Sequence, residues 1–149
     1  MSEQTEAAEP LPPIRFDTKI AVVLREDLQP WQALNVCAFL MSGVAAGHPE
    51  TIGEAYEDAD GNRYLSMFRQ PVVVLEGNKE MLRAAHGRAL DRELPMALYT
   101  ENLFLTGSDR DNRAAVRAVP REGLDLVGIA VHGKKNVVDK VMKGAAMHR

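Results

Sequence analysis

The residues best suited to catalysis are two carboxylates that follow apolar segments. Asp27 follows the apolar run at 20–24, and Glu101 follows the apolar segment at 95–100. A carboxylate that is partly removed from water can act as a general base. We therefore take Asp27 and Glu101 as the candidate catalytic residues.

Four polar side chains near these carboxylates are candidate ligand-binding residues. Gln32 and Asn35 interrupt an apolar segment that continues to residue 46, and Thr100 and Asn102 flank Glu101. A buried amide without a partner costs about 1–3 kcal/mol, so Gln32 and Asn35 need hydrogen-bond partners. Those partners are either the backbone of a neighbouring loop or a bound ligand, and the sequence leaves both interpretations open.

The elements that must position these residues begin with a strand, a turn and a long helix. The strand is predicted at 19–24, because an unbroken apolar run is typical of a strand covered on both faces. Pro30 suits a first helical turn and Gly47 is a stop signal, so the helix is predicted over 30–46. This helix is apolar nearly all round, which predicts burial on more than one side, under another layer or against a second subunit.

The rest of the chain alternates between predicted strands and helices. Further strands are predicted at 71–75, 95–100 and 126–132, and helices at 79–93 (capped by Asn78), 112–119 (capped by Asp111) and after Asn136, which is expected to cap the last helix. Asp60-Gly61 predicts an inserted hairpin. The alternation predicts an α/β fold with a largely parallel or mixed sheet and helices on both faces. We expect an acidic, proline-bearing disordered arm at 1–17 and one domain at 18–149.

Composition excludes several classes of site. The single cysteine, Cys37, excludes an internal disulfide and a cysteine-rich metal site. There is no glycine-rich phosphate loop and no His/Cys metal spacing, so we predict no cofactor and no metal, and the roles of His48, His86 and His132 stay undetermined. No stretch has the length of a membrane span and the first 17 residues lack the regions of a signal peptide, so a cytoplasmic protein without a membrane partner is expected.

The charges are distributed unevenly along the chain. Acidic residues outnumber basic ones in residues 1–80, and basic residues outnumber acidic ones in residues 81–149. The C-terminal half can therefore present a modest basic face, which gives RNA weak support as a partner. No aromatic residues alternate with these basic positions, as a surface that stacks single-stranded RNA would need, and nothing favours DNA.

Several segments resemble a known superfamily. Residues 19–28 (KIAVVLREDL) and 126–141 are similar to the first strand and turn and to the last strand and helix of type II peptidyl-tRNA hydrolases. With WQALNVCAFL at 31–40 and an inserted hairpin, the chain more closely resembles a bacterial sister group, the domain-of-unknown-function family two thousand of the peptidyl-tRNA hydrolase II superfamily. The resemblance covers residues 18–149 and implies a three-layer α/β/α fold around a mixed four-stranded sheet.

The resemblance also bears on the site. In the hydrolases a lysine and a glutamine one turn apart face the substrate, and here Gln32 stands at the lysine and Val36 at the glutamine. Only the acidic positions, Asp27 and Glu101, are kept in kind. The missing lysine removes a positive charge that could hold an RNA phosphate or stabilise an oxyanion.

Three functions follow as alternatives. The first, which we favour, is a small-molecule-binding protein or a hydrolase-like enzyme that uses a pocket at the carboxyl ends of the first and third strands. The second is a residual hydrolase acting on peptidyl-tRNA. The third is a non-enzymatic interaction module, with a homodimer formed through the first helix.

Overall fold

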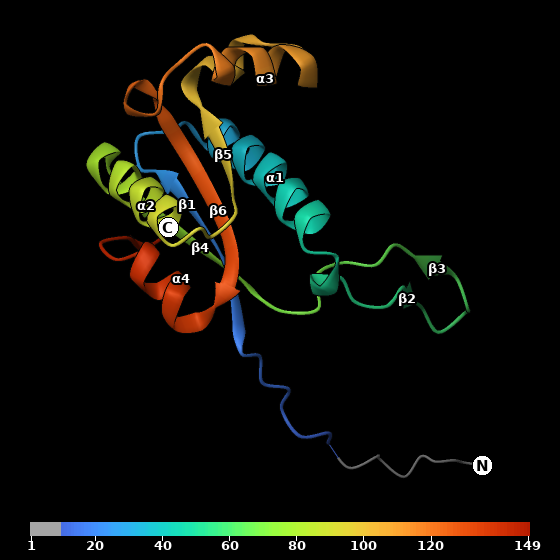
Figure 1. Ribbon diagram of the computed structural model, residues 1–149. Helices are drawn as coiled ribbons and strands as arrows, with labels where there is room; N and C mark the ends of the chain where they lie inside the picture. Colours follow the sequence, from blue (N-terminus) through green and yellow to red (C-terminus); the bar gives the residue numbers. More distant parts are fainter. Residues whose placement is uncertain (1–9) are drawn as a thin grey trace, which may run out of the picture.

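The apolar run at 20–24 lies at the centre of a mixed sheet in the computed structural model, which describes residues 10–149 (Figure 1). β1 (Thr18–Arg25) pairs in parallel with β4 (Val72–Gly77) and antiparallel with β6 (Leu126–Lys134). β5 (Met96–Thr100) lies outside β6, and β7 (Ala146–Met147) lies outside β4, so the order is β5-β6-β1-β4-β7. The prediction of a mixed sheet is confirmed.

The prediction of four strands is wrong, because β7 adds a fifth. The chain turns at Gly144, whose φ of 100° is readily adopted only by glycine, and Ala146 then pairs with Glu76 of β4. Two exposed residues carry no strand pattern, so this short edge strand depends on the unpaired edge of β4 rather than on its own sequence.

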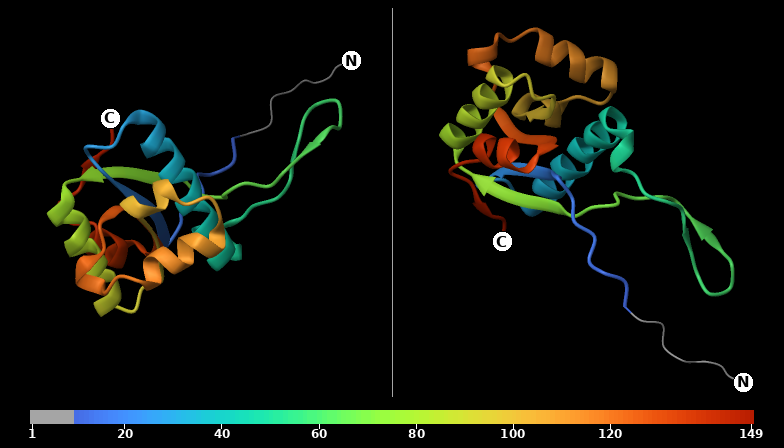
Figure 2. Two further views of the ribbon diagram at one scale, coloured as in Figure 1. Left: turned by 90° about the horizontal axis from the view of Figure 1, so that it is seen from above. Right: turned by 60° about the horizontal axis from the view of Figure 1, so that its bottom comes forward.

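Helices cover both faces of the sheet in three layers (Figures 1 and 2). α1 (Pro30–Gly47) packs on one face, where a cluster of buried residues includes Ile20, Val36 and Leu40. α2 (Lys79–Asp91) and α4 (Lys135–Val141) pack on the other face, over a second cluster that includes Leu82 and Val138. The sheet is therefore buried on both sides, which explains the continuous apolar runs of β1 and β6.

Within residues 10–149, α1 is buried on one side only, so no second layer covers it as one alternative predicted, and burial against a second subunit stays a prediction. Its buried positions are Ala33, Val36, Leu40 and Val44, all on one side of the helix. Trp31, Leu34 and Phe39 are 62%, 74% and 52% exposed, so no layer of the described chain covers the opposite side. Apolar composition predicted that the helix has a buried face, but it did not predict how much of the helix stays exposed.

Helix starts agree with the sequence at one predicted cap and differ at two. Asn78 caps α2 by accepting a hydrogen bond from the Met81 amide, as predicted. α3 (Asp109–Arg117) is capped by Ser108 and not by Asp111, which instead donates its amide to the Ser108 hydroxyl. α4 begins at Lys135 without a side-chain cap, so the predicted capping role of Asn136 is wrong.

The predicted hairpin is present and extends away from the body of the molecule (Figure 2). β2 (Tyr56–Glu57) and β3 (Arg63–Tyr64) are joined by a turn in which Gly61 has φ 87°. The Asp58 carboxylate holds this turn, because it accepts hydrogen bonds from the amides of residues 60 and 62, the side chain of Asn62 and the hydroxyl of Tyr64. These contacts lower the pKa of Asp58 to about 2, the bond from Tyr64 having the largest effect.

This depressed pKa predicts acid weakening of the hairpin. The unfolded carboxyl titrates near pH 4, so its contribution to hairpin order is complete above about pH 4 and is lost as the pH falls towards 2. An NMR titration should give Asp58 a midpoint near 2, and the Asp58→Asn variant should show faster exchange of the Asn62 amide at pH 7. An ordinary midpoint near 4 would contradict this account of the turn.

The N-terminal part of the chain adds no regular element in the described residues. Of the predicted disordered arm at 1–17, residues 1–9 lie outside the part that the structure describes. Residues 10–17 form no helix or strand and are mostly exposed. The short helical turns of the described residues are η1 (Pro49–Thr51), η2 (Glu101–Leu105) and η3 (Arg121–Gly123). None of the helices in residues 10–149 combines the length and apolar character that a membrane crossing requires.

Candidate functional site

The carboxyl ends of three strands and the amino end of a fourth lie together at one end of the sheet. β1 and β4 run parallel, and β5 has the same direction because both β1 and β5 are antiparallel to β6. Arg25 therefore lies beside Gly77, and the amide of Glu101 donates to the carbonyl of Asp125 just before β6 begins. Polar residues at these four strand ends meet although they are up to 100 positions apart.

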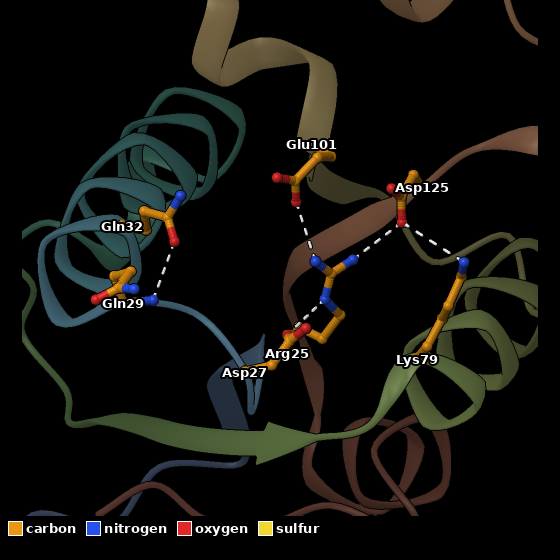
Figure 3. Close-up of polar contacts among 7 residues, drawn as sticks. All are labelled: Arg25, Asp27, Gln29, Gln32, Lys79, Glu101 and Asp125. Carbon is orange, nitrogen blue, oxygen red and sulfur yellow. Dashed lines mark hydrogen bonds and ion pairs between the residues drawn. The ribbon is translucent and has the colours of Figure 1, made fainter.

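Arg25 lies at the centre of the polar residues at this end of the sheet (Figure 3). Its guanidinium donates to Asp27 at 2.7 Å, to Asp125 at 2.9 Å and to Glu101 at 3.0 Å. Lys79, at the start of α2, adds a longer contact to Asp125 at 4.0 Å. We call these five residues the Arg25 cluster. The sequence analysis predicted Asp27 and Glu101 as neighbours but missed the arginine that joins them.

The electrostatics of the Arg25 cluster fix its charges in place. Partial burial by itself would lower the pKa of Arg25, but the hydrogen bond to Asp27 and the charges of Asp27, Asp125 and Glu101 raise it overall. The Arg25 side chain is 14% exposed, whereas the three carboxylates are 42–65% exposed. The guanidinium is thus a permanently charged anchor that ties the loop after β1 to η2 and to the start of β6.

A hydrophilic cleft of about 410 Å³ opens beside the Arg25 cluster. Its lining combines the arginine and lysine with four carboxylates and one amide, namely Arg25, Glu26, Asp27, Asn78, Lys79, Glu80 and Asp125. Carboxylates outnumber cations in this lining, so the cleft disfavours an anion such as RNA phosphate. Asp27 and Glu101 already accept hydrogen bonds from Arg25, which leaves them as anchoring groups in this structure.

The four candidate ligand-binding residues do not form one constellation. Gln32 accepts a hydrogen bond from the Gln29 amide at 3.0 Å, so it completes the N-terminus of its own helix. Thr100 is buried at 3% exposure, and Asn102 is exposed on η2. Asn35 alone lines a cavity, on the side of α1 that faces η2 and α3.

That cavity is walled by aromatic rings. Trp31 and Phe104 meet edge to face at 5.8 Å between centroids, Tyr99 and Phe104 lie 5.2 Å apart, and Phe39 and Tyr99 lie 5.9 Å apart. Two adjoining hollows, of about 440 and 560 Å³, share Phe39, Ser42, Tyr99, Leu103, Asp109 and Asn112 in their linings. We call the combined space the aromatic cavity, and it lies between α1, the end of β5, η2 and α3.

Polar groups lie at defined places around the aromatic cavity. Asn35 lines its first hollow, and Asn112 hydrogen-bonds with Thr106 on the opposite wall. Arg113 and Arg117 of α3 line the second hollow. Arg113 is paired with Asp109 at 3.0 Å, whereas Arg117 makes no ion pair within residues 10–149. No sequence pattern predicts this cavity, because an exposed aromatic residue on an apolar helix has the same pattern as a buried one.

Of the three histidines whose roles the sequence left undetermined, two lie together and one lies apart. His86 is 6% exposed within α2, and its pKa is lowered by burial and by the nearby charges of Arg121 and Arg83. His48 and His132, in contrast, lie with their ring centroids 4.7 Å apart at the end of α1. They lie at the other end of β1 from the Arg25 cluster, since His132 pairs with Ile20.

Comparison with known proteins gives a family match and matches to solved structures, and the two kinds of match agree. Residues 18–149 match the family described as "Protein of unknown function (DUF2000)". A solved structure, Atu0240, a protein of unknown function from Agrobacterium tumefaciens strain C58, is 46% identical and has a TM-score of 0.88. The similarity covers 91% of this chain and 100% of that one. The comparison with curated proteins gives no match.

The family match spans all of the strands and helices that carry the Arg25 cluster and the aromatic cavity. The family prediction made from the strand and helix segments is therefore confirmed at that level. On these grounds, the chain belongs to the DUF2000 family of proteins of unknown function.

Proposed function

We propose that the protein binds a small organic molecule in the aromatic cavity, and that this molecule combines a planar apolar body with an anionic group. The observation that carries the proposal is the exposure of aromatic rings inside a concavity. Trp31 and Phe39 remain 62% and 52% exposed while they line hollows of several hundred Å³. Concave apolar surfaces with a few polar groups are the usual form of small-molecule sites.

The lining supports the chemical class of the ligand. Trp31, Phe39, Tyr99 and Phe104 offer ring faces and edges to a planar body. Burial raises the pKa of Tyr99, so its hydroxyl stays protonated. Arg117, which has no ion-pair partner in the described chain, is the natural contact for an anionic group.

The proposal is binding rather than catalysis. Asp27 and Glu101, the predicted catalytic carboxylates, are both engaged by Arg25 at 2.7 and 3.0 Å. Neither of them lines the aromatic cavity. A pocket near the carboxyl ends of the first and third predicted strands (β1 and β5) therefore remains our proposal, with its lining moved from the carboxylates to the rings.

The experiment uses 8-anilinonaphthalene-1-sulfonate, a planar aromatic anion. Trp31 is the single tryptophan of the chain and lines the cavity, so its emission should fall as the probe binds and accepts its energy. We expect saturable binding to one site. Asn35→Asp should weaken it about tenfold, because a negative charge near the probe anion costs about 1–2 kcal/mol.

A matched control separates this site from general apolar binding. Asn136→Asp places the same charge at an exposed position of α4, across the sheet from the cavity, and should leave the affinity unchanged. Leu34→Ala removes an exposed apolar side chain of α1 that does not line the cavity. Equal weakening by Asn136→Asp, or loss of binding in Leu34→Ala with none in Asn35→Asp, would refute the proposal.

We also propose that the fold is that of the peptidyl-tRNA hydrolase II superfamily. The similarity of residues 19–28 and 126–141 supports this relation, and these segments contain the neighbouring strands β1 and β6 together with α4. Superposition on a type II peptidyl-tRNA hydrolase should match strands β5, β6, β1 and β4 in order and direction. A different order would remove the relation. The excess of carboxylates beside Arg25 disfavours an RNA substrate. We therefore expect no hydrolysis of peptidyl-tRNA by this protein, even if the fold is shared.

A further inference from the structure

Three side chains with metal-binding chemistry meet at the end of the molecule opposite the Arg25 cluster. His48 directly follows α1, and Glu50 lies two residues later in η1. His132 belongs to β6, beside Ile20 of β1. Since Val131 packs towards α2 and α4, and side chains alternate along a strand, His132 projects to the α1 face, where His48 lies.

The three side chains are close enough to share one ion. One ligand atom from each of them lies within 4.8 Å of the other two. His48 Nδ1 is 3.6 Å from Glu50 Oε2, and the His48 and His132 ring centroids are 4.7 Å apart. Bonds of about 2.0–2.2 Å to a tetrahedral Zn²⁺ place ligand atoms roughly 3.3–3.5 Å apart. The ligand atoms therefore need to approach one another by up to roughly 1.5 Å. The Glu50 side chain is 64% exposed and is free to move towards the two rings.

The buried histidine gives an independent reason to expect a ligand. His132 is 8% exposed, yet its ring makes no hydrogen bond to any group in residues 10–149. A buried polar group without a partner costs free energy, and a metal ion in contact with the ring nitrogen would satisfy it.

The backbone holds the first two ligands in place. The His48 amide donates to the Val44 carbonyl at 2.9 Å, and the His48 carbonyl accepts from the amide and hydroxyl of Thr51 at 2.9 and 2.7 Å. Thr51 is 1% exposed, so this turn is anchored in the protein. The carboxyl end of α1 also carries a partial negative charge that favours a cation.

We propose that His48, Glu50 and His132 bind one Zn²⁺ ion and leave a fourth position open to water or a small ligand. Two imidazoles and one carboxylate are a donor set that zinc uses when one position stays open. The nitrogen donors favour a first-row transition metal over Mg²⁺ or Ca²⁺, which prefer oxygen. His48 also lines a hollow of about 280 Å³ between α1 and β5, which gives the fourth position a route to solvent.

The proposal is tested by titrating the chelator-treated full chain with Zn²⁺ in a calorimeter, and with Co²⁺ as a visible probe. We expect one ion per chain, a dissociation constant in the micromolar range or below, and a higher melting temperature with metal. Co²⁺ should give the strong visible absorption of a four-coordinate site.

Variants assign the ion to these residues. His48→Gln should weaken Zn²⁺ binding at least a hundredfold, and Glu50→Gln about tenfold. Glu50 is mostly exposed, so its variant should fold, which circular dichroism can check. His148→Gln is the matched control, because His148 also lies near a carboxylate, 3.9 Å from Glu76, but without a second histidine.

The outcomes are distinct. Unchanged affinity in His148→Gln together with the losses in His48→Gln and Glu50→Gln supports the site. No saturable Zn²⁺ or Co²⁺ binding by the wild-type chain overturns it, as does binding that survives His48→Gln and is lost in His148→Gln. Because the site and the aromatic cavity share no lining residue, either proposal can fail while the other stands.

Discussion

Replacing Gly128 with valine should destabilise the protein by about 3 kcal/mol, because no side chain fits between β6 and α1 at this position. A Cβ atom on Gly128 would lie 2.6 Å from Val36 Cγ1, 2.9 Å from Leu40 Cδ1 and 3.3 Å from Leu24 Cδ2. Val36 and Leu40 are 0% and 1% exposed and have no free space to move into. The helix would have to shift outward, and with it Trp31 in the wall of the aromatic cavity.

Urea unfolding measures this effect, and Gly107→Val provides the control. A Cβ on Gly107 meets no atom within 4 Å and its position is exposed, so its variant should stay within about 0.5 kcal/mol of the wild type. Gly128→Ala should fall between the two. Equal unfolding midpoints for Gly128→Val and Gly107→Val would mean that α1 does not pack this closely on β6.

Arg25→Met should lower the free energy of unfolding by about 1–2 kcal/mol, which is the second large effect that we expect. The methionine keeps much of the volume but leaves Asp27, Glu101 and Asp125 without the cation that joins them. Removing one partner of a buried ion pair costs about 3–5 kcal/mol. We expect less here because the carboxylates are 42–65% exposed and water can solvate them. Lys79, 4.0 Å from Asp125, compensates only in part.

Salt and a second arginine test this explanation. The difference in the free energy of unfolding between wild type and Arg25→Met should become smaller at high ionic strength. Screening reduces both the attraction that the variant loses and the repulsion among the remaining carboxylates. Arg113→Met is the control, because Arg113 pairs with Asp109 alone and both side chains are mostly exposed. If Arg25→Met is no less stable than Arg113→Met, the Arg25 cluster does not tie the strand ends together.

The two groups of predictions probe different properties of one architecture. Gly128 sets the distance between α1 and the sheet, and Arg25 fixes the loops at the sheet edge. Both determine where α1 stands relative to η2 and α3, and so the shape of the aromatic cavity. A change in probe affinity in either variant, measured under conditions where it is folded, would link the scaffold to the proposed binding site.

Local pattern was sufficient for most elements of the fold. The apolar run after Lys19 predicted β1, Pro30 and Gly47 bounded α1 within one residue, and Asp60-Gly61 predicted the hairpin. The cap of α2 at Asn78 was also correct. These features depend on neighbouring residues, through backbone preferences and hydrogen bonds within a few positions, so they can be read from short segments.

Features that depend on distant contacts were not determined by local patterns. β7 exists because β4 offers an unpaired edge, and α1 is exposed on one side because no other layer of residues 10–149 covers it. Gln32 was a candidate ligand contact, yet it closes the first turn of its own helix. A polar residue on an apolar helix has several partners within reach, and its sequence position does not rank them.

The candidate sites divide in the same way. By itself the sequence determined the mixed α/β fold, the family, and the placement of Asp27 and Glu101 at strand ends, while their catalytic role stays a prediction. Only the tertiary structure brought Arg25 to Asp125 across 100 positions, joined four aromatic rings into one cavity, and placed His132 beside His48. The physical reason is that strand order and register decide which distant side chains meet, and these are set by packing of the whole chain rather than by any local pattern.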